Sequence, residues 1–140
     1  MSVEETQQTI QSYVDALLSG GDFAASFTDD VEWTTMETGE RVRGREAVRD
    51  HIVALHSQAF DASPELRSLA TSDGVAMLEA VFVGTQTAEF AGVPPTGASV
   101  RVAYAMSYDI ADGQISALRA YFPVGAIVAQ LREAAAVTTV

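Results

Sequence analysis

The stretch VRVAYAMSYDIADGQISALRAYF, residues 100–122, holds two β-rich runs on either side of Asp112-Gly113. An Asp-Gly step between alternating runs is the strongest short-range signal for a β-hairpin. With these two residues as the loop, Ser107 falls opposite Leu118. Because side chains alternate along a strand, one face of the hairpin is predicted to be small and apolar. That face consists of Ala103, Ala105, Ser107, Leu118, Ala120 and Phe122.

The opposite face of this hairpin is predicted to be bulky and amphipathic, with Tyr104, Met106, Tyr108, Arg119 and Tyr121. The small face suits the wall of a pocket, and the bulky face suits an interface between subunits. The alternation alone also permits the reverse arrangement, in which the small residues only pack under a helix.

Outside the hairpin, apolar spacing and turn residues predict helices around further strands. The predicted helices cover residues 3–19, 22–27, 45–60 and 123–132, and the predicted strands cover 31–35, 65–71 and 75–84. Ser63-Pro64 and residues 85–98 are expected to be loops, and the tail from about residue 133 is expected to be loose. The sequence therefore predicts one α+β domain over residues 1–140. We expect helices on the concave face of a curved antiparallel sheet, enclosing an apolar pocket.

Composition excludes several classes of function. The formal net charge of −11 disfavours binding to nucleic acids and to anionic membranes. The chain has no cysteine, so thiolate metal sites and thiol nucleophiles are excluded. It has no lysine, so Schiff-base chemistry at a lysine is excluded as well. The acidic start and the absence of a long apolar run predict a cytoplasmic protein without a membrane span.

An ordered set of short motifs runs along nearly the whole chain. They are IQSYVDALLSGGD (10–22), TDDVEW (28–33), VRGREAV (42–48), GTQT (84–87), FAGVPPTG (90–97), DGQI (112–115) and AYFP (120–123). This set resembles the SnoaL-like polyketide cyclases, or ester cyclase group, of the nuclear-transport-factor-2-like superfamily. More distantly, it is similar to ketosteroid isomerases and limonene-type epoxide hydrolases.

The resemblance implies a cone-shaped fold, an apolar pocket for a small hydrophobic molecule, and a homodimer. It also implies enzymes that use neither a metal nor a cofactor and that perform acid-base chemistry inside a dry cavity. The superfamily includes non-catalytic binding domains as well, so the fold leaves the function open.

Several acid and base positions of these relatives are not retained. The aspartate on the last strand of the cyclases and epoxide hydrolases corresponds to Ala120, and two further epoxide hydrolase positions fall near Ala80 and Phe82. The general base of the steroid isomerases corresponds to Thr35, and their second oxyanion acid falls near Ser107 or Met106, depending on the gap placed in the hairpin. Their oxyanion tyrosine, in contrast, is matched by Tyr13.

The candidate catalytic residues are therefore Tyr13, His56 and Gln86. A phenol at Tyr13 can donate to an oxyanion, Gln86 can orient a carbonyl, and a histidine is the best available base at neutral pH. His56 follows Leu55 on the predicted inward side of its helix and is preferred to His51. Each residue also fits a purely structural role. The candidate substrate-binding residues are Trp33, Thr35, Leu55, Ala105, Ser107, Leu118, Ala120 and Phe122.

Two functions from different classes follow. One is a cofactor-free cyclase or isomerase that acts on a small polyketide- or terpenoid-like substrate, by acid-base chemistry or through the shape of its pocket. The other is a non-catalytic module that binds a hydrophobic small molecule. An epoxide hydrolase with a non-standard site is a further alternative.

Overall fold

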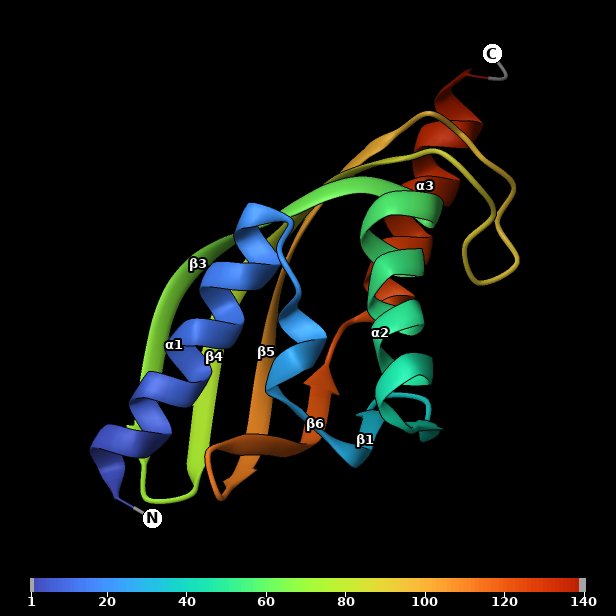
Figure 1. The fold of residues 1–140 in the computed structure, drawn as a ribbon. Coiled ribbons are helices and arrows are strands. Elements are labelled where there is room, and N and C mark those ends of the chain that lie inside the picture. The colour runs from blue at the N-terminus through green and yellow to red at the C-terminus, as the bar shows by residue number, and fades with distance from the viewer. Residues whose placement is uncertain (1, 139–140) are drawn as a thin grey trace.

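The computed structural model describes residues 2–138 and confirms the predicted α+β class. In chain order the elements are α1 Val3–Ser19, η1 Phe23–Ser26, β1 Phe27–Thr35, β2 Glu40–Arg43, α2 Arg45–Val53, η2 Ala54–Ala59, β3 Phe60–Ser72, β4 Val75–Gln86, β5 Ser99–Ala111, β6 Gln114–Tyr121 and α3 Val124–Thr138. Figure 1 shows α1, η1 and α2 in front of one curved sheet, with α3 behind its upper end.

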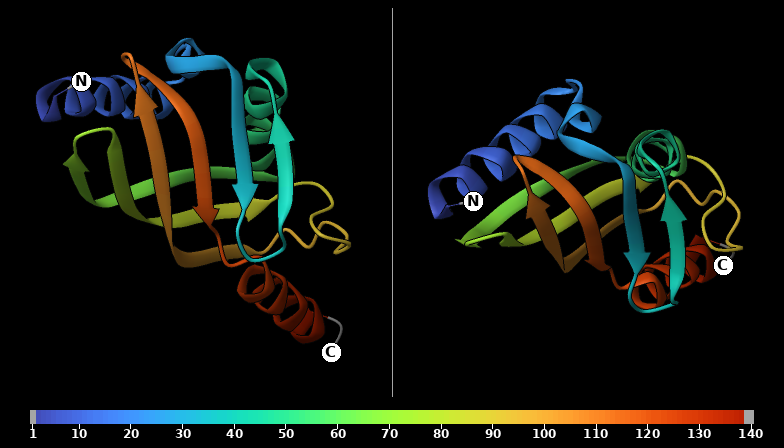
Figure 2. Two further views of the ribbon diagram at one scale, coloured as in Figure 1. Left: turned by 90° about the horizontal axis from the view of Figure 1, so that it is seen from below. Right: turned by 60° about the horizontal axis from the view of Figure 1, so that its bottom comes forward.

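Within residues 2–138, six strands form a single sheet in the order β2-β1-β6-β5-β4-β3. Neighbouring strands run antiparallel except for β1 and β6, which are parallel. The long strands β3, β4 and β5 bend across the molecule, so that the sheet curves around α1 and α2 (Figure 2). The space between this concave face and the two helices holds the apolar core and the candidate site.

Helix α1 follows the predicted boundaries, because both of its ends carry a specific signal. The Ser2 hydroxyl accepts a hydrogen bond from the backbone N–H of Glu5 at 3.2 Å, and Gly20 ends the helix with a φ of 76°. One stripe of the helix is buried against the sheet and includes Ile10, Tyr13 and Val14. Tyr13 is thereby held in the core with its ring toward the strands.

The predicted helix over residues 45–60 is confirmed as far as Ala59, but its second part is not a regular α-helix. Helix α2 ends at Val53 and continues as the π-helical turn η2, which carries Leu55 and His56. The predicted loop at Ser63-Pro64 is wrong, because β3 starts at Phe60 and pairs with β4 through this segment. The proline is tolerated because β3 is an edge strand, where an absent N–H can face away from the sheet.

Smaller differences concern the ends of other elements. Strand β1 begins at Phe27 rather than at residue 31, and β2 was not predicted. The Asp22 side chain makes no capping hydrogen bond to η1. Strand β4 extends to Gln86, and helix α3 continues past Arg132 to Thr138, while residues 139–140 lie outside the described part of the chain.

The β5–β6 hairpin is confirmed, but its predicted register is wrong. Asp112 and Gly113 adopt positive φ values of 52° and 74°, as a type I′ loop requires. Between the pairs Ile110–Ile115 and Asp109–Ala117 the register shifts, leaving Ser116 as an extra residue in β6. Such a bulge moves all later pairs by one position and exchanges the faces of the partner strand.

Beyond the bulge, Leu118 therefore lies opposite Tyr108, and Ala120 lies opposite Met106. Ser107 lies opposite Arg119, and Ala105 opposite Tyr121. The concave face of the hairpin carries Tyr104, Met106, Tyr108, Leu118, Ala120 and Phe122. Of the residues predicted to form the pocket wall, Leu118, Ala120 and Phe122 lie on the expected concave face. The predicted wall residues on β5, Ala103, Ala105 and Ser107, lie on the opposite face.

The core is dominated by aromatic rings in edge-to-face contact on the concave side. Phe82 lies at its centre, with its ring 5.2 Å from Phe60, 5.1 Å from Phe122 and 6.0 Å from His56 between centroids. In the described part of the chain, no helix is long and apolar enough to cross a membrane.

Candidate functional site

A small cavity lies between the concave face of the sheet and helices α1 and α2. Its volume is about 30 Å³, more than the roughly 10–15 Å³ that a buried water molecule requires. The lining residues are Tyr13, Leu17, Trp33, Ile52, Leu55, His56, Phe82, Tyr104, Met106, Tyr108 and Phe122. We refer to this space as the inner cavity. Its wall is apolar except for three phenols, the Trp33 indole and one imidazole.

The three phenols come from α1 and β5 and lie close together. The ring centroids of Tyr13 and Tyr108 are 5.7 Å apart, and Tyr104 reaches the cavity from the same face of β5. Among the described residues, none forms a hydrogen bond with any of the three hydroxyls. Burial raises the pKa of Tyr104 to about 12, and burial with the nearby Tyr13 and Tyr104 raises the pKa of Tyr108 well above 10.0. Within residues 2–138 these phenols are therefore neutral donors without an acceptor.

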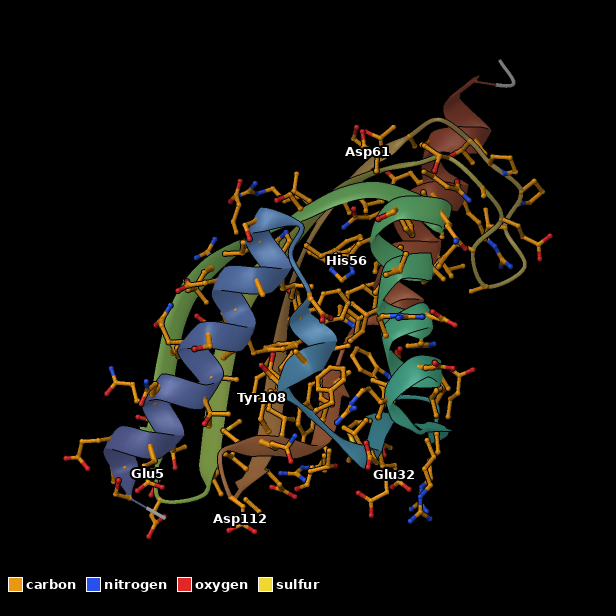
Figure 3. The ribbon with its side chains drawn as sticks, viewed as in Figure 1. Glu5, Glu32, His56, Asp61, Tyr108 and Asp112 are labelled. Atoms are coloured by element: carbon orange, nitrogen blue, oxygen red, sulfur yellow. The ribbon has the colours of Figure 1, made fainter. Side chains whose placement is uncertain are left out.

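His56 enters the cavity from the π-helical turn η2. Its Nδ1 lies 2.8 Å from the backbone oxygen of Ile52, and since a carbonyl only accepts, Nδ1 carries the proton. Nε2 is then the unprotonated nitrogen. Burial lowers the pKa of His56 below its usual 6.5, although the bond to Ile52 opposes this change. Figure 3 shows His56 directed into the space between α1 and α2, above the sheet that carries Tyr108.

Trp33 and Thr35 lie at the end of β1 and form the border of a second, larger space. The Trp33 Nε1–H donates to the Thr35 hydroxyl at 2.9 Å, and the Trp33 ring lies 5.0 Å from the His51 ring. This space has a volume of about 440 Å³ and is lined by Trp33, Thr35, Thr38, Glu40, His51, Ala54, Leu55, Ala59, Phe90, Ala91, Phe122 and Val124. We refer to it as the outer groove. It shares Trp33, Leu55 and Phe122 with the inner cavity.

The predicted substrate-binding residues divide into three groups. Trp33, Leu55 and Phe122 line both spaces, and Thr35 lines the outer groove. Leu118 and Ala120 are fully buried beneath the concave face and line neither space.

Ala105 and Ser107 were placed on the wrong face, because the bulge at Ser116 shifts the register. The Ser107 hydroxyl instead accepts a hydrogen bond from Arg119 at 2.9 Å, and Arg119 pairs with Asp109 at 2.8 Å. These contacts belong to the outer face of the sheet, away from both spaces.

Gln86 has a structural role that leaves no group for a substrate. Its amide nitrogen donates to the backbone oxygens of Ala88 and Val93, each at 3.0 Å. Its amide oxygen accepts from the backbone N–H of Thr96 at 2.9 Å and from the Thr96 hydroxyl at 2.7 Å. The side chain is buried and holds both ends of the loop over residues 87–98, which contributes Phe90 to the outer groove.

The residues that the sequence did not identify are Tyr104 and Tyr108, which the predicted register placed on the outer face. One available signal argued against that placement. Arg101 and Asp109 are an even number of residues away from Ala105 and Ser107, so all four side chains lie on the same face of the strand. Charged side chains mark the face of a strand that is exposed to solvent. The alternation of β5 alone would therefore have turned its tyrosines inward.

The inner cavity contains no carboxylate among its described lining residues. The positions of the missing family acids, Ala120, Ala80 and Phe82, are buried as apolar core. In the described part of the chain, no group of three or more His, Cys, Asp or Glu side chains is placed to hold a metal ion. His56 is thus the candidate base of this cavity, and the three phenols are its candidate hydrogen-bond donors.

Comparisons with known proteins agree with this architecture. A protein from Jannaschia sp. CCS1, provisionally described as a SnoaL-like polyketide cyclase, is 19% identical with a TM-score of 0.81, over 91% of this chain and 92% of that chain. A provisional polyketide cyclase from Xanthomonas campestris is 20% identical with a TM-score of 0.77, over 92% and 98%. A provisional ketosteroid isomerase from Kribbella flavida is 20% identical with a TM-score of 0.68, over 86% and 79%.

At these identities the similarity shows the fold, and a comparison with curated proteins gives no match. The sequence model of the SnoaL-like domain, however, matches residues 10–118, which is most of the chain and runs from the middle of α1 into β6. Together with the curved sheet and its covering helices, this match shows that the chain belongs to the SnoaL-like domain family.

Proposed function

We propose that this protein is a cofactor-free enzyme that moves a proton at the carbon next to a carbonyl of a small hydrophobic substrate. This is the step from which an isomerisation or an aldol-type cyclisation begins. The observation that carries the proposal is the meeting of three phenols with Nε2 of His56 at one apolar cavity, where none of these groups has a hydrogen-bond partner among the described residues. The names of the structural relatives, polyketide cyclase and ketosteroid isomerase, support the same chemistry.

The proposed step uses the neutral forms of both kinds of side chain. The Nε2 lone pair of His56 removes a proton from the α-carbon, and the C–H electron pair moves into the forming enolate. The carbonyl oxygen gains the negative charge and accepts hydrogen bonds from Tyr13 and from its neighbours on β5. The imidazolium then returns its proton to the enolate, at the same carbon or at a conjugated one. Alternatively, the enolate carbon attacks a second carbonyl and closes a ring, and the imidazolium gives its proton to the resulting alkoxide.

The dry surroundings favour this division of roles. Burial lowers the pKa of His56, so the imidazole is unprotonated at neutral pH and ready to accept a proton. Burial raises the pKa of Tyr13, so this phenol keeps its proton and acts as a donor rather than as a base. The hydrogen bond from Nδ1 to Ile52 fixes the tautomer that presents Nε2.

A small ketone tests the proposal without knowledge of the natural substrate. The bicyclic ketone 2-tetralone is incubated in D₂O, and loss of its α-proton signals is followed by NMR against a buffer blank. We expect exchange above the blank, with a loss of about 10²-fold or more in His56→Gln, as is typical for removal of a general base. Tyr13→Phe is expected to lose about 10-fold or more. Tyr121→Phe, at an exposed phenol, is the matched control.

A second function, a non-catalytic binding module, is favoured because no carboxylate is found among the described residues that line the inner cavity. Stoichiometric binding of the ketone without enhanced exchange would support this module and contradict the enzyme. The homodimer stays a prediction, and light scattering on the purified protein tests it.

A further inference from the structure

The outer groove differs from the inner cavity in size and is the larger by far. A volume of about 440 Å³ lies within the range of about 300–1,000 Å³ that small-molecule sites occupy. The inner cavity, at about 30 Å³, has room for only a few atoms of a ligand. A ligand that reaches the phenols with its carbonyl therefore needs a larger space beside the cavity for its body, and the outer groove provides one. The two spaces meet at Trp33, Leu55 and Phe122.

The walls of the outer groove fit a flat ring system. Trp33, Phe90 and Phe122 contribute aromatic surface from three separate parts of the chain. The His51 ring lies 5.0 Å from the Trp33 ring and extends that surface along α2. Aromatic walls of this kind favour the burial of a planar ligand through area and ring stacking.

The polar groups of the outer groove gather at one end of the β1–β2 hairpin. Thr35 and Glu40 are directly opposite each other in the antiparallel pair, so their side chains lie on the same face of the sheet. The Thr35 hydroxyl is buried and accepts the Trp33 Nε1–H, which leaves its own proton without an acceptor among the described residues. Glu40 supplies a carboxylate, the one negative charge among the described lining residues.

The electrostatics of the groove disfavour an anionic ligand. Burial lowers the pKa of His51, so this ring is neutral at pH 7 although Glu40 opposes the change. The groove therefore presents one carboxylate with no compensating cation among its described lining residues, in a chain with a net charge of −11. A ligand group that donates a hydrogen bond and carries no negative charge fits this environment.

We propose that the outer groove binds the body of the substrate and selects an uncharged ring system with a hydroxyl at the end remote from the reacting carbonyl. The hydroxyl donates to Glu40 and accepts from Thr35, while the rings lie against Trp33 and Phe122. This orientation rests on the proposed function, because that function places the carbonyl at the phenols. The substrate class is thus a hydroxylated cyclic ketone rather than a carboxylic acid.

Three ketones that differ at one position test the selection by calorimetric titration. They are 2-tetralone, 6-hydroxy-2-tetralone and 6-carboxy-2-tetralone. We expect the hydroxyl compound to bind about 10-fold more tightly than 2-tetralone, as a hydrogen bond to a charged group allows. The carboxylate compound is expected to bind more weakly than 2-tetralone. Trp33 is the sole tryptophan of the chain, so a change in its emission on binding reports occupancy of the groove.

Matched variants separate the groove from the rest of the protein. Thr35→Val and Glu40→Ala are each expected to reduce the preference for the hydroxyl compound, and the double variant to abolish it. Thr34→Val and Glu32→Ala are the controls, because the alternation along β1 places both on the other face of the sheet. The controls are expected to keep the preference.

Equal affinities of the three ketones for the wild-type protein would overturn the proposal. So would a preference that persists in the double variant, or no binding of the hydroxyl compound at millimolar concentration. Proton exchange is measured in a separate experiment, so the proposed enzyme function and the proposed selection by the outer groove can be refuted independently of each other. A hydroxyl preference without exchange leaves the groove standing and refutes the enzyme. Proton exchange without a preference for the hydroxyl compound leaves the enzyme standing and refutes the proposal for the groove.

Discussion

Replacing Gln86 by leucine tests how the loop over residues 87–98 is held against the sheet. The substitution keeps the approximate size of the side chain and removes four hydrogen bonds, with lengths of 2.7–3.0 Å. A net value of about 0.5–1.5 kcal/mol for each gives about 2–6 kcal/mol. Most of the partner groups are only partly buried and can bind water after the change, so we expect about 2–4 kcal/mol.

Urea unfolding measures this loss, and Gln58→Leu on the exposed side of η2 is the control, expected to change stability by less than about 0.5 kcal/mol. Amide hydrogen exchange locates the effect, because Thr96 donates its N–H directly to Gln86 and should exchange faster in the variant. A loss below about 0.5 kcal/mol, with unchanged exchange at Thr96, would refute the reasoning.

Two further perturbations follow from the packing and from the histidines. Gly84→Ala would place its Cβ 2.8 Å from the Cβ of Ala62, so we expect a loss of about 1–3 kcal/mol in urea unfolding, largely recovered by adding Ala62→Gly. Burial lowers the pKa of both His51 and His56 in the folded state, so the unfolded state binds more protons as the pH falls below 6.5. The free energy of unfolding should therefore fall as the pH drops from 6.5 toward the folded pKa values, and His51→Gln/His56→Gln should lack this component. Parallel pH profiles for the wild-type protein and the double variant would contradict this expectation.

The sequence predicted those features of the fold that depend on local chemistry. The boundaries of α1 follow from its apolar spacing and from Gly20, where the helix ends in a left-handed conformation, and the hairpin loop follows from Asp112-Gly113. Strand β3 could not be predicted in the same way, because a proline signals a break unless the strand is known to lie at an edge. Edge position is a property of the whole sheet, and no local pattern carries it.

The residues of the candidate site were predicted only in part. Tyr13 was identified through its match to the oxyanion tyrosine of the steroid isomerases. His56 was identified through its place beside Leu55 on the predicted inward side of its helix, and both residues line the inner cavity. Tyr104 and Tyr108 were missed because one extra residue, Ser116, reverses the pairing of the hairpin, and a bulge has no sequence signal as strong as that of the turn. Gln86 was assigned to catalysis because the hydrogen bonds that occupy it come from a loop whose path the sequence does not define.

The most direct test of the central claim is the pH dependence of proton exchange in 2-tetralone, measured at low ketone concentration. With His56 as the base, the enzyme-dependent rate should rise as the imidazole loses its proton below pH 6.5 and then reach a plateau near neutral pH. In His56→Gln, the rate should follow the buffer blank across the whole range. A wild-type rate that keeps rising with hydroxide concentration above neutral pH, or a His56→Gln variant that retains the plateau, would contradict the assignment of His56 as the base.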